Sequence, residues 1–201
     1  MGLLMDAANA WNNLRHTRYY LMLGWRGRWS SELVLDFHPA QFPHLAGMQY
    51  ADDVDFGVNR AELRGEKLLP KLLKAESKID DSLIEKAAKW DTWIKGRLQG
   101  IVALEATLDS DFIICQYDPE KVPHGTQIQA EYVIKNINTG MNFFVFLNED
   151  EGRYFCCSIF QLVHVDYTTN QRRVKVLKKR KWVGKNLLID YTNPYYIPNN
   201  K

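Results

Sequence analysis

The chain has 201 residues, of which 46% are hydrophobic and 25% are charged, with a formal net charge of +2. This composition is that of a globular protein with a sizeable core, and it excludes an intrinsically disordered chain. Because the net charge is small, bulk electrostatics alone does not indicate a nucleic-acid partner.

The three cysteines, Cys115, Cys156 and Cys157, are an odd number and two are adjacent. They therefore predict buried, reduced thiols rather than a disulfide framework. No stretch of the sequence approaches the length of a membrane span, and the first residues do not resemble a signal peptide. We expect a cytoplasmic protein without membrane contact.

The first half of the chain predicts helices and one β-hairpin. Residues 3–16 form an amphipathic pattern, and the segments RYYLML and SSELVLDF flank GWRGRW, whose glycines suit a turn. Residues 58–76 are helical in pattern and contain Pro70, which is expected to kink them. Residues 80–108 predict a longer helix, and its apolar face consists of Leu83, Ala87, Trp90, Ile94, Leu98 and Ile101.

Gly96 and Gly100 lie one turn apart in this predicted helix. They favour either a close contact with a partner helix or close packing on the protein's own sheet.

The second half predicts an antiparallel sheet, because short polar turns separate runs of β-forming residues. The strands are expected near residues 112–117, 128–136, 142–148, 153–162 and 173–178. Helices first and strands later, without βαβ alternation, indicate an α+β fold. We expect an N-terminal β-hairpin and helices packed on a curved antiparallel β-sheet, in a single domain of residues 1–185 with a C-terminal tail at 186–201.

The strongest charge feature is the sequence RRVKVLKKRKWVGK at residues 172–185, which contains no acidic residue. Such a stripe can neutralise phosphates along a nucleic acid. A lysine-protected edge strand explains it equally well. The candidate nucleic-acid-binding residues are Arg172, Arg173, Lys175, Lys179, Arg180 and Lys181.

No motif indicates a metal or a cofactor. The sequence has no C-x-x-C, no H-x-x-x-H, no EF-hand spacing and no Walker or Rossmann glycine pattern. The acidic group Asp52, Asp53 and Asp55 is explained more simply by a solvated turn than by a metal site. We therefore expect neither metal nor cofactor.

Cleavage of RNA without a metal requires a base for the ribose 2′-hydroxyl, an acid for the departing 5′-oxygen and donors for the phosphorane charge. Ser158 is the one hydroxyl in the apolar run from Phe155 to Val163, and it lacks the G-x-S-x-G context of a hydrolase nucleophile. It could contact a phosphate oxygen, or it could bond to a neighbouring strand.

Eight short segments occur in a distinctive order: YYLML, FPHLAGM, the helix start at Asn59–Arg60, IQAEYVIK, NFFVFL, CSIF, DYTTNQ and KVLKK. In this order they resemble a phage-borne nuclease-like family of the barnase–EndoU–colicin–RelE superfamily of metal-independent ribonucleases. The resemblance covers roughly residues 15–181, and family members occur in prophages and other mobile elements of bacteria. The chain departs from the family in two places. The segment around Trp25 and Trp29 contains more aromatic residues than the family leads us to expect, and Ile159 stands where an aromatic residue is expected.

The resemblance implies a small helical N-terminal part and a sheet that carries the active face. The family pattern matches at His44, Leu45, Gly47, Ser158, Phe160, Tyr167, Gln171, Val176, Leu177 and Lys178. The polar members give the candidate catalytic residues His44, Ser158, Tyr167, Gln171 and Lys178.

Two histidines, His38 and His44, lie six residues apart, which fits no helical pair of metal ligands. His38 is outside the family pattern and is expected to be structural or exposed. His44 is expected in a short turn packed by Phe42 and Leu45, with its imidazole toward the sheet. A buried histidine bonded to a backbone carbonyl remains an open alternative.

The sequence thus favours a metal-independent endoribonuclease that uses attack by the 2′-hydroxyl, with RNA as substrate. A phage or mobile-element toxin with a cognate inhibitor protein is one setting for it. The alternatives are a non-catalytic nucleic-acid-binding module and a phage protein that inhibits a host enzyme.

Overall fold

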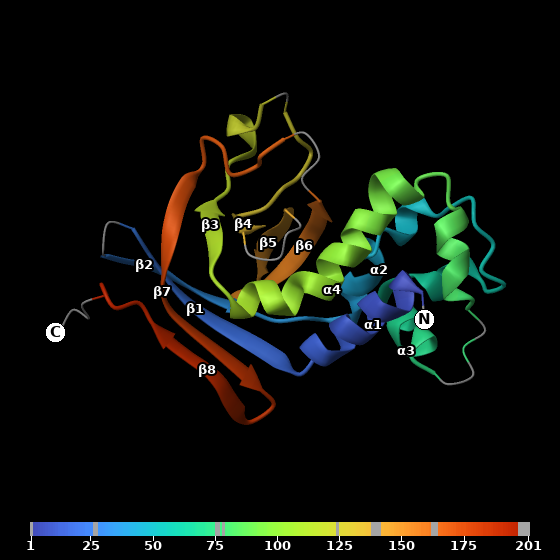
Figure 1. Ribbon diagram of the computed structural model, residues 1–201, viewed down its shortest axis with the longest axis horizontal. Coiled ribbons are helices and arrows are strands. Elements are labelled where there is room, and N and C mark those ends of the chain that lie inside the picture. Colours follow the sequence, from blue (N-terminus) through green and yellow to red (C-terminus); the bar gives the residue numbers. More distant parts are fainter. Residues whose placement is uncertain are drawn as a thin grey trace.

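A computed structural model describes residues 2–25, 28–74, 77, 79–123, 125–137, 142–161 and 165–196. The strands curl into a barrel, and the helices gather at one side of it, on the right in Figure 1. In this part of the chain no helix combines the length and apolar character needed to cross a membrane.

The α-helices are α1 (Leu3–Leu14), α2 (Phe42–Leu45), α3 (Leu68–Leu72) and α4 (Lys95–Asp109). The amphipathic pattern predicted for α1 is confirmed, because this helix buries Leu4, Ala7, Ala8, Trp11 and Leu14. The predicted helix at residues 58–76 is reduced to α3 and two preceding 3₁₀ turns, and Pro70 lies inside α3.

The long helix predicted at residues 80–108 is wrong in its first half. A 3₁₀ turn at Asp81–Lys86 and a π turn at Trp90–Ile94 precede α4. Between the two turns the amide of Ala88 donates to the Asp53 carboxylate at 2.8 Å, so a side chain from another segment takes a hydrogen bond that a continuous helix would make.

The strands form one eight-stranded sheet in the order β1-β2-β6-β5-β4-β3-β7-β8. Their bounds are β1 (Thr17–Trp25), β2 (Arg28–Leu35), β3 (Phe112–Gln116), β4 (Tyr132–Asn136), β5 (Phe143–Asp150), β6 (Arg153–Gln161), β7 (Arg172–Val183) and β8 (Asn186–Thr192). The predicted end of β6 at residue 162 falls outside the described residues.

The expected curved sheet is in fact closed: seven strands, β1 to β7, form a barrel, and β8 extends the sheet beyond β7. The N-terminal hairpin β1–β2 is confirmed, but β1 also pairs with β7 from Thr17↔Val183 to Gly24↔Lys175. The hairpin is therefore part of the wall rather than an element packed on it. The overall α+β class is confirmed.

The barrel closes between β2 and β6 through a single parallel pair, Leu35↔Tyr154. Asp36 reinforces this seam: its amide donates to the Tyr154 carbonyl at 3.0 Å, and its carboxylate accepts from Arg18 and Arg153, both at 2.6 Å. Beyond this point β6 continues without β2 beside it, and α2 packs there instead.

Residues 186–192, expected in a tail, form β8, which pairs with β7 around a turn at Gly184. These residues therefore extend the sheet as an edge strand beside β7.

The main core joins the inward faces of the barrel strands to α1 and α4. A Cβ on Gly100 would lie 3.0 Å from Ile159, and one on Gly96 would lie 3.1 Å from Gln161 Cβ. The two glycines thus serve close packing of α4 on the protein's own strand β6. A second cluster, centred on Phe144 and Phe146, lies on the outer face of the sheet.

Candidate active site

His44 lies in α2, where its neighbours hold it in place. Phe42 and Leu45 are buried, as expected, and Gly47 leaves the helix with a φ of +79°. The His44 side chain itself is exposed. The two apolar anchors therefore fix the backbone on both sides of a solvent-accessible imidazole.

The pKa of His44 is lowered from its ordinary value. Partial desolvation contributes most, and the positive charge of Arg97 acts in the same direction, whereas a hydrogen bond to the Cys157 backbone in β6 opposes them. His44 is consequently neutral near pH 7 and can accept a proton.

Arg97, in the first turn of α4, is only 5% exposed and faces no carboxylate in the described structure. Its guanidinium carbon lies 5.4 Å from the Tyr50 ring centre and 5.7 Å from that of Phe160. The guanidinium also donates a hydrogen bond to the Tyr50 hydroxyl, but its Nε and Nη1 have no partner among the described residues. Burial lowers the pKa of this guanidinium, and an uncompensated buried cation costs several kcal/mol.

Gly47 and the π turn together bring Arg97 to His44. A Cβ on Gly47 would lie 3.2 Å from Arg97 Cδ and 3.3 Å from the Trp93 carbonyl oxygen. The π turn at Trp90–Ile94 leads directly into α4. Single π turns within helices are frequent at functional sites, because the extra residue redirects side chains.

Ser158 and Tyr167 lie on the same side of β6 as Phe160. The pairs Phe146↔Ser158 and Phe144↔Phe160 share the outer face of the sheet. The Tyr167 ring centre lies 5.3 Å from that of Phe160, and burial raises the pKa of its phenol. Three side chains therefore contact β6 on either side of Ser158. His44 bonds to the Cys157 backbone, and both Arg97 and Tyr167 contact the Phe160 ring.

Gln171 is near this cluster but its amide is occupied. Its Oε1 accepts from the Asp118 amide and its Nε2 donates to the Asp118 carbonyl, both at 2.9 Å. These bonds tie the loop at Asp118 to the start of β7, so both ends of the Gln171 amide are taken up by contacts within the fold.

Lys178 lies elsewhere, on β7. Its ammonium is 5.8 Å from the Tyr196 ring centre, and it lines a hollow with Tyr20, Met22 and Arg180. No contact of the described residues connects it to His44.

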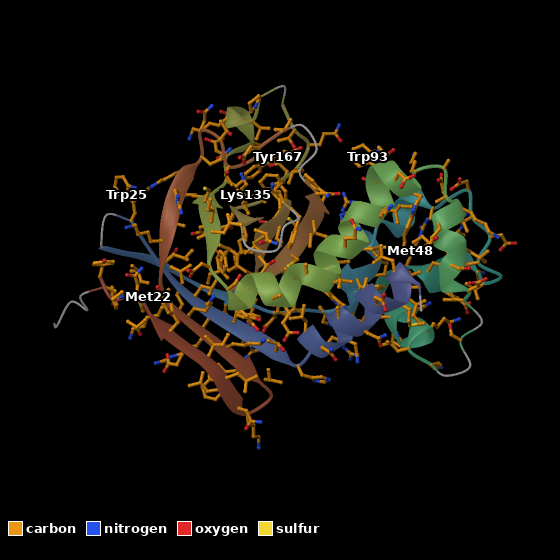
Figure 2. All side chains as sticks on the ribbon, viewed as in Figure 1. Met22, Trp25, Met48, Trp93, Lys135 and Tyr167 are labelled. Atoms are coloured by element: carbon orange, nitrogen blue, oxygen red, sulfur yellow. The ribbon has the colours of Figure 1, made fainter. Side chains whose placement is uncertain are left out.

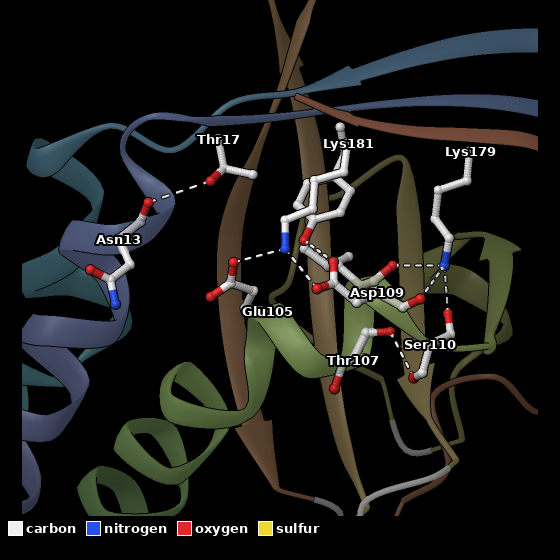
Figure 3. A network of polar contacts seen from close by, with 10 residues as sticks. Asn13, Thr17, Glu105, Thr107, Asp109, Ser110, Lys179 and Lys181 are labelled. Atoms are coloured by element: carbon white, nitrogen blue, oxygen red, sulfur yellow. Dashed lines mark hydrogen bonds and ion pairs between the residues drawn. The ribbon is translucent and has the colours of Figure 1, made fainter. Parts of the chain in front are cut away.

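Two lysines of the basic stripe, Lys179 and Lys181, point into the protein, as Figure 3 shows. Lys179 is 5% exposed and donates to the carbonyls of Leu108, Asp109 and Ser110, at the C-terminal end of α4. Lys181 is 4% exposed and pairs with Glu105 at 2.8 Å and Asp109 at 2.6 Å. Burial leaves these two ammonium groups no surface for a phosphate.

The other four candidate nucleic-acid-binding residues, Arg172, Arg173, Lys175 and Arg180, are exposed. Arg172 stacks 4.3 Å from the Trp25 ring centre, and Arg180 pairs with Asp190 at 3.0 Å. Arg173 and Lys175 line a cavity of about 560 Å³ together with Tyr191 and Tyr195.

The described residues hold no group of three or more His, Cys, Asp or Glu side chains suited to a metal. Asp53 and Asp55 are used in loop hydrogen bonds, to Ala88 and Gly57. His38 caps the 3₁₀ turn at Pro39–Gln41 through Nδ1, so its expected structural role is confirmed.

Arg97 is absent from the residues selected by sequence because its position is not distinctive there. It follows Ile94 by three residues and precedes Ile101 by four, but Lys86 has the same spacing from Leu83 and Trp90. The structure separates the two, since Arg97 is buried and Lys86 is exposed.

The structure is thus a helix-flanked β-barrel with an exposed imidazole beside a buried guanidinium. A family model described as phage-Barnase-EndoU-ColicinE5/D-RelE like nuclease 4 matches residues 3–192, and the chain belongs to this family of phage-type nucleases. No curated protein and no solved structure matches the chain. The resemblance noted in the sequence is confirmed.

Proposed function

We propose that the protein is an endoribonuclease that cleaves RNA without a metal ion. The observation that carries the proposal is the pairing of an exposed, neutral His44 with the buried Arg97, which has no counter-charge among the described residues. The phosphodiester of a nucleic acid would supply the missing negative charge.

His44 would act as the general base. A neutral imidazole takes the proton from the ribose 2′-hydroxyl, and the resulting oxygen attacks the adjacent phosphorus. The bond to the 5′-oxygen breaks, which leaves a 2′,3′-cyclic phosphate and a 5′-hydroxyl. Two hydroxyl groups on β6 and its following turn, Ser158 and Tyr167, are candidates to donate to phosphoryl oxygens and to the departing oxygen.

Arg97 would stabilise the phosphorane charge. A cation shielded from water by Tyr50 and Phe160 acts more strongly than one in solvent, and it needs no reorganisation during the reaction. Gln171 would position the loops around the site. Lys178 is left out of this centre because its contacts lie on β7.

Product chemistry tests this proposal. RNA incubated with the protein in EDTA should give 2′,3′-cyclic phosphate and 5′-hydroxyl ends, and an oligonucleotide with a single 2′-deoxyribose at the cleaved position should resist. Equal cleavage of the 2′-deoxy substrate, or products with 5′-phosphates, would contradict attack by the 2′-hydroxyl.

A second candidate is a non-catalytic nucleic-acid-binding module. The cavity that combines Arg173 and Lys175 with Tyr191 and Tyr195 favours it, because cations and aromatic rings together bind single strands. Salt-dependent binding to RNA without any cleavage in EDTA would support this alternative. A toxin role with an inhibitor protein fits the phage-type family but follows only if cleavage is found.

A further inference from the structure

Beside the His44–Arg97 pair, an exposed tryptophan lies stacked on a tyrosine. The Trp93 side chain is 48% exposed, and its ring lies 5.5 Å from that of Tyr50 at an interplanar angle of 25°. Figure 2 labels Trp93 at the surface, near the start of α4. Tyr50 in turn contacts the Arg97 guanidinium, so the stack is continuous with the candidate active site.

The backbone holds this stack firmly. Trp93 belongs to the π turn that leads into α4, and its carbonyl oxygen would lie 3.3 Å from a Cβ on Gly47. One residue later, Ile94 is fully buried. Trp93 is therefore a rigid aromatic surface at a fixed position relative to His44.

Cations surround the stack. Lys89 Nζ lies 5.8 Å from the Tyr50 ring centre, and Arg97 lies at 5.4 Å. Lys95 is half-exposed and pairs with Asp91 at 3.6 Å. Flat aromatic faces next to ammonium groups are the combination that binds single-stranded nucleic acid, because bases stack on the rings while the cations attract the backbone.

We propose that Trp93, backed by Tyr50, is a stacking platform for one unpaired base of the RNA, next to the phosphate that enters the His44–Arg97 site. The substrate would accordingly be single-stranded at this position, since a base within a duplex already has both faces covered by its neighbours. This inference rests on the proposed function for the position of the scissile phosphate.

Binding to an uncleavable strand tests the platform independently of catalysis. A fully 2′-O-methylated RNA oligonucleotide and its duplex are titrated against the wild type, Trp93→Leu and Trp93→Phe. Leu188→Ala, an exposed apolar position on β8, is the control. Stacking on an aromatic side chain is worth about 1–3 kcal/mol per base, or roughly five- to 150-fold in affinity.

We expect the wild type to bind the single strand more tightly than the duplex. Trp93→Leu should lose at least about fivefold in affinity, whereas Trp93→Phe and Leu188→Ala should remain within about threefold of the wild type. Each variant is checked by thermal melting, and because Trp93 is exposed, folding should be retained.

Unchanged single-strand binding by a folded Trp93→Leu protein would overturn the platform, and so would equal affinity for single strand and duplex. An absence of any RNA binding would also overturn it, as expected if Trp93 served a protein partner. Failure of the wild type to cleave unmodified RNA while Trp93-dependent binding persists would remove the catalytic proposal and leave the platform standing. Cleavage at the wild-type rate by Trp93→Leu would remove the platform and leave the catalytic proposal standing.

Discussion

Gly47 lies close against Arg97, and a Cβ on Gly47 would make a tight contact of 3.2 Å with Arg97 Cδ. Gly47→Ala should therefore displace Arg97 and also strain the backbone, whose φ of +79° is unfavourable for alanine by about 1–3 kcal/mol. We expect lower stability in urea denaturation and reduced RNA cleavage. Gly57→Ala is the matched control, since Gly57 has a φ of +67° and no atom within 4 Å of its Cβ position. It should be destabilised similarly and remain active, and equal activity of the two variants would contradict a role for the Arg97 position.

The pKa of His44 should depend on the charge at residue 97. Desolvation is the main cause of the lowered pKa, and Arg97 is the second. Arg97→Met should therefore raise the imidazole pKa part of the way to its ordinary value of 6.5, while Arg97→Lys should leave it low. An NMR titration of the His44 ring measures this directly. Identical pKa values in the methionine and lysine variants would show that the two residues are not electrostatically coupled.

The lowered pKa of His44 also makes the stability of the fold depend on pH. Because the pKa of His44 is lower in the folded than in the unfolded protein, the unfolded state binds the proton more tightly. His44 thus contributes stability above pH 6.5 that is lost as the pH falls through its folded pKa. Replacement by glutamine should flatten the pH dependence of the unfolding free energy in that range, which denaturation at several pH values measures. A profile as steep as that of the wild type would contradict the lowered pKa.

The two buried lysines of β7 should matter for stability. Burial opposes protonation of Lys181, but its hydrogen bonds with Asp109 and Glu105 raise its pKa overall. Lys181→Met would leave these partly exposed carboxylates without their cation, and we expect the free energy of unfolding to fall by about 2–4 kcal/mol.

Lys179→Met would remove the ammonium group that caps the last carbonyls of α4, and it should also lower the free energy of unfolding. Lys175→Met, at an exposed position of the same strand, should have little effect. A loss as large at Lys175 would rule out the buried network as the cause.

Local patterns predicted those parts of the fold that depend on neighbouring residues. The buried face of α1 follows from its own periodicity, and the turn that presents His44 follows from Phe42, Leu45 and Gly47. Barrel closure could not be predicted in this way, because it depends on pairing β1 with β7 across most of the chain.

Two errors have the same physical origin in contacts distant in sequence. The helix expected from residue 80 is interrupted where Ala88 bonds to Asp53, 35 residues earlier. In sequence, Lys179 and Lys181 have the pattern of a solvent-exposed stripe. In the structure Lys181 pairs with Glu105 and Asp109 of α4, more than 70 residues earlier, and Lys179 donates to carbonyls at the end of the same helix. Arg97 could not be identified from its spacing, because Lys86 has the same relation to the predicted apolar face, and only the burial of Arg97 in the structure distinguishes it.

The most direct test of the account is turnover by His44→Ala in EDTA, with cleavage and thermal melting measured on the same preparation. A general base is typically worth about a hundredfold to ten-thousandfold in rate. We predict a loss of that size with a melting temperature close to that of the wild type, since the His44 side chain is exposed. Wild-type turnover by a well-folded His44→Ala protein would contradict the assignment of His44 as the catalytic base.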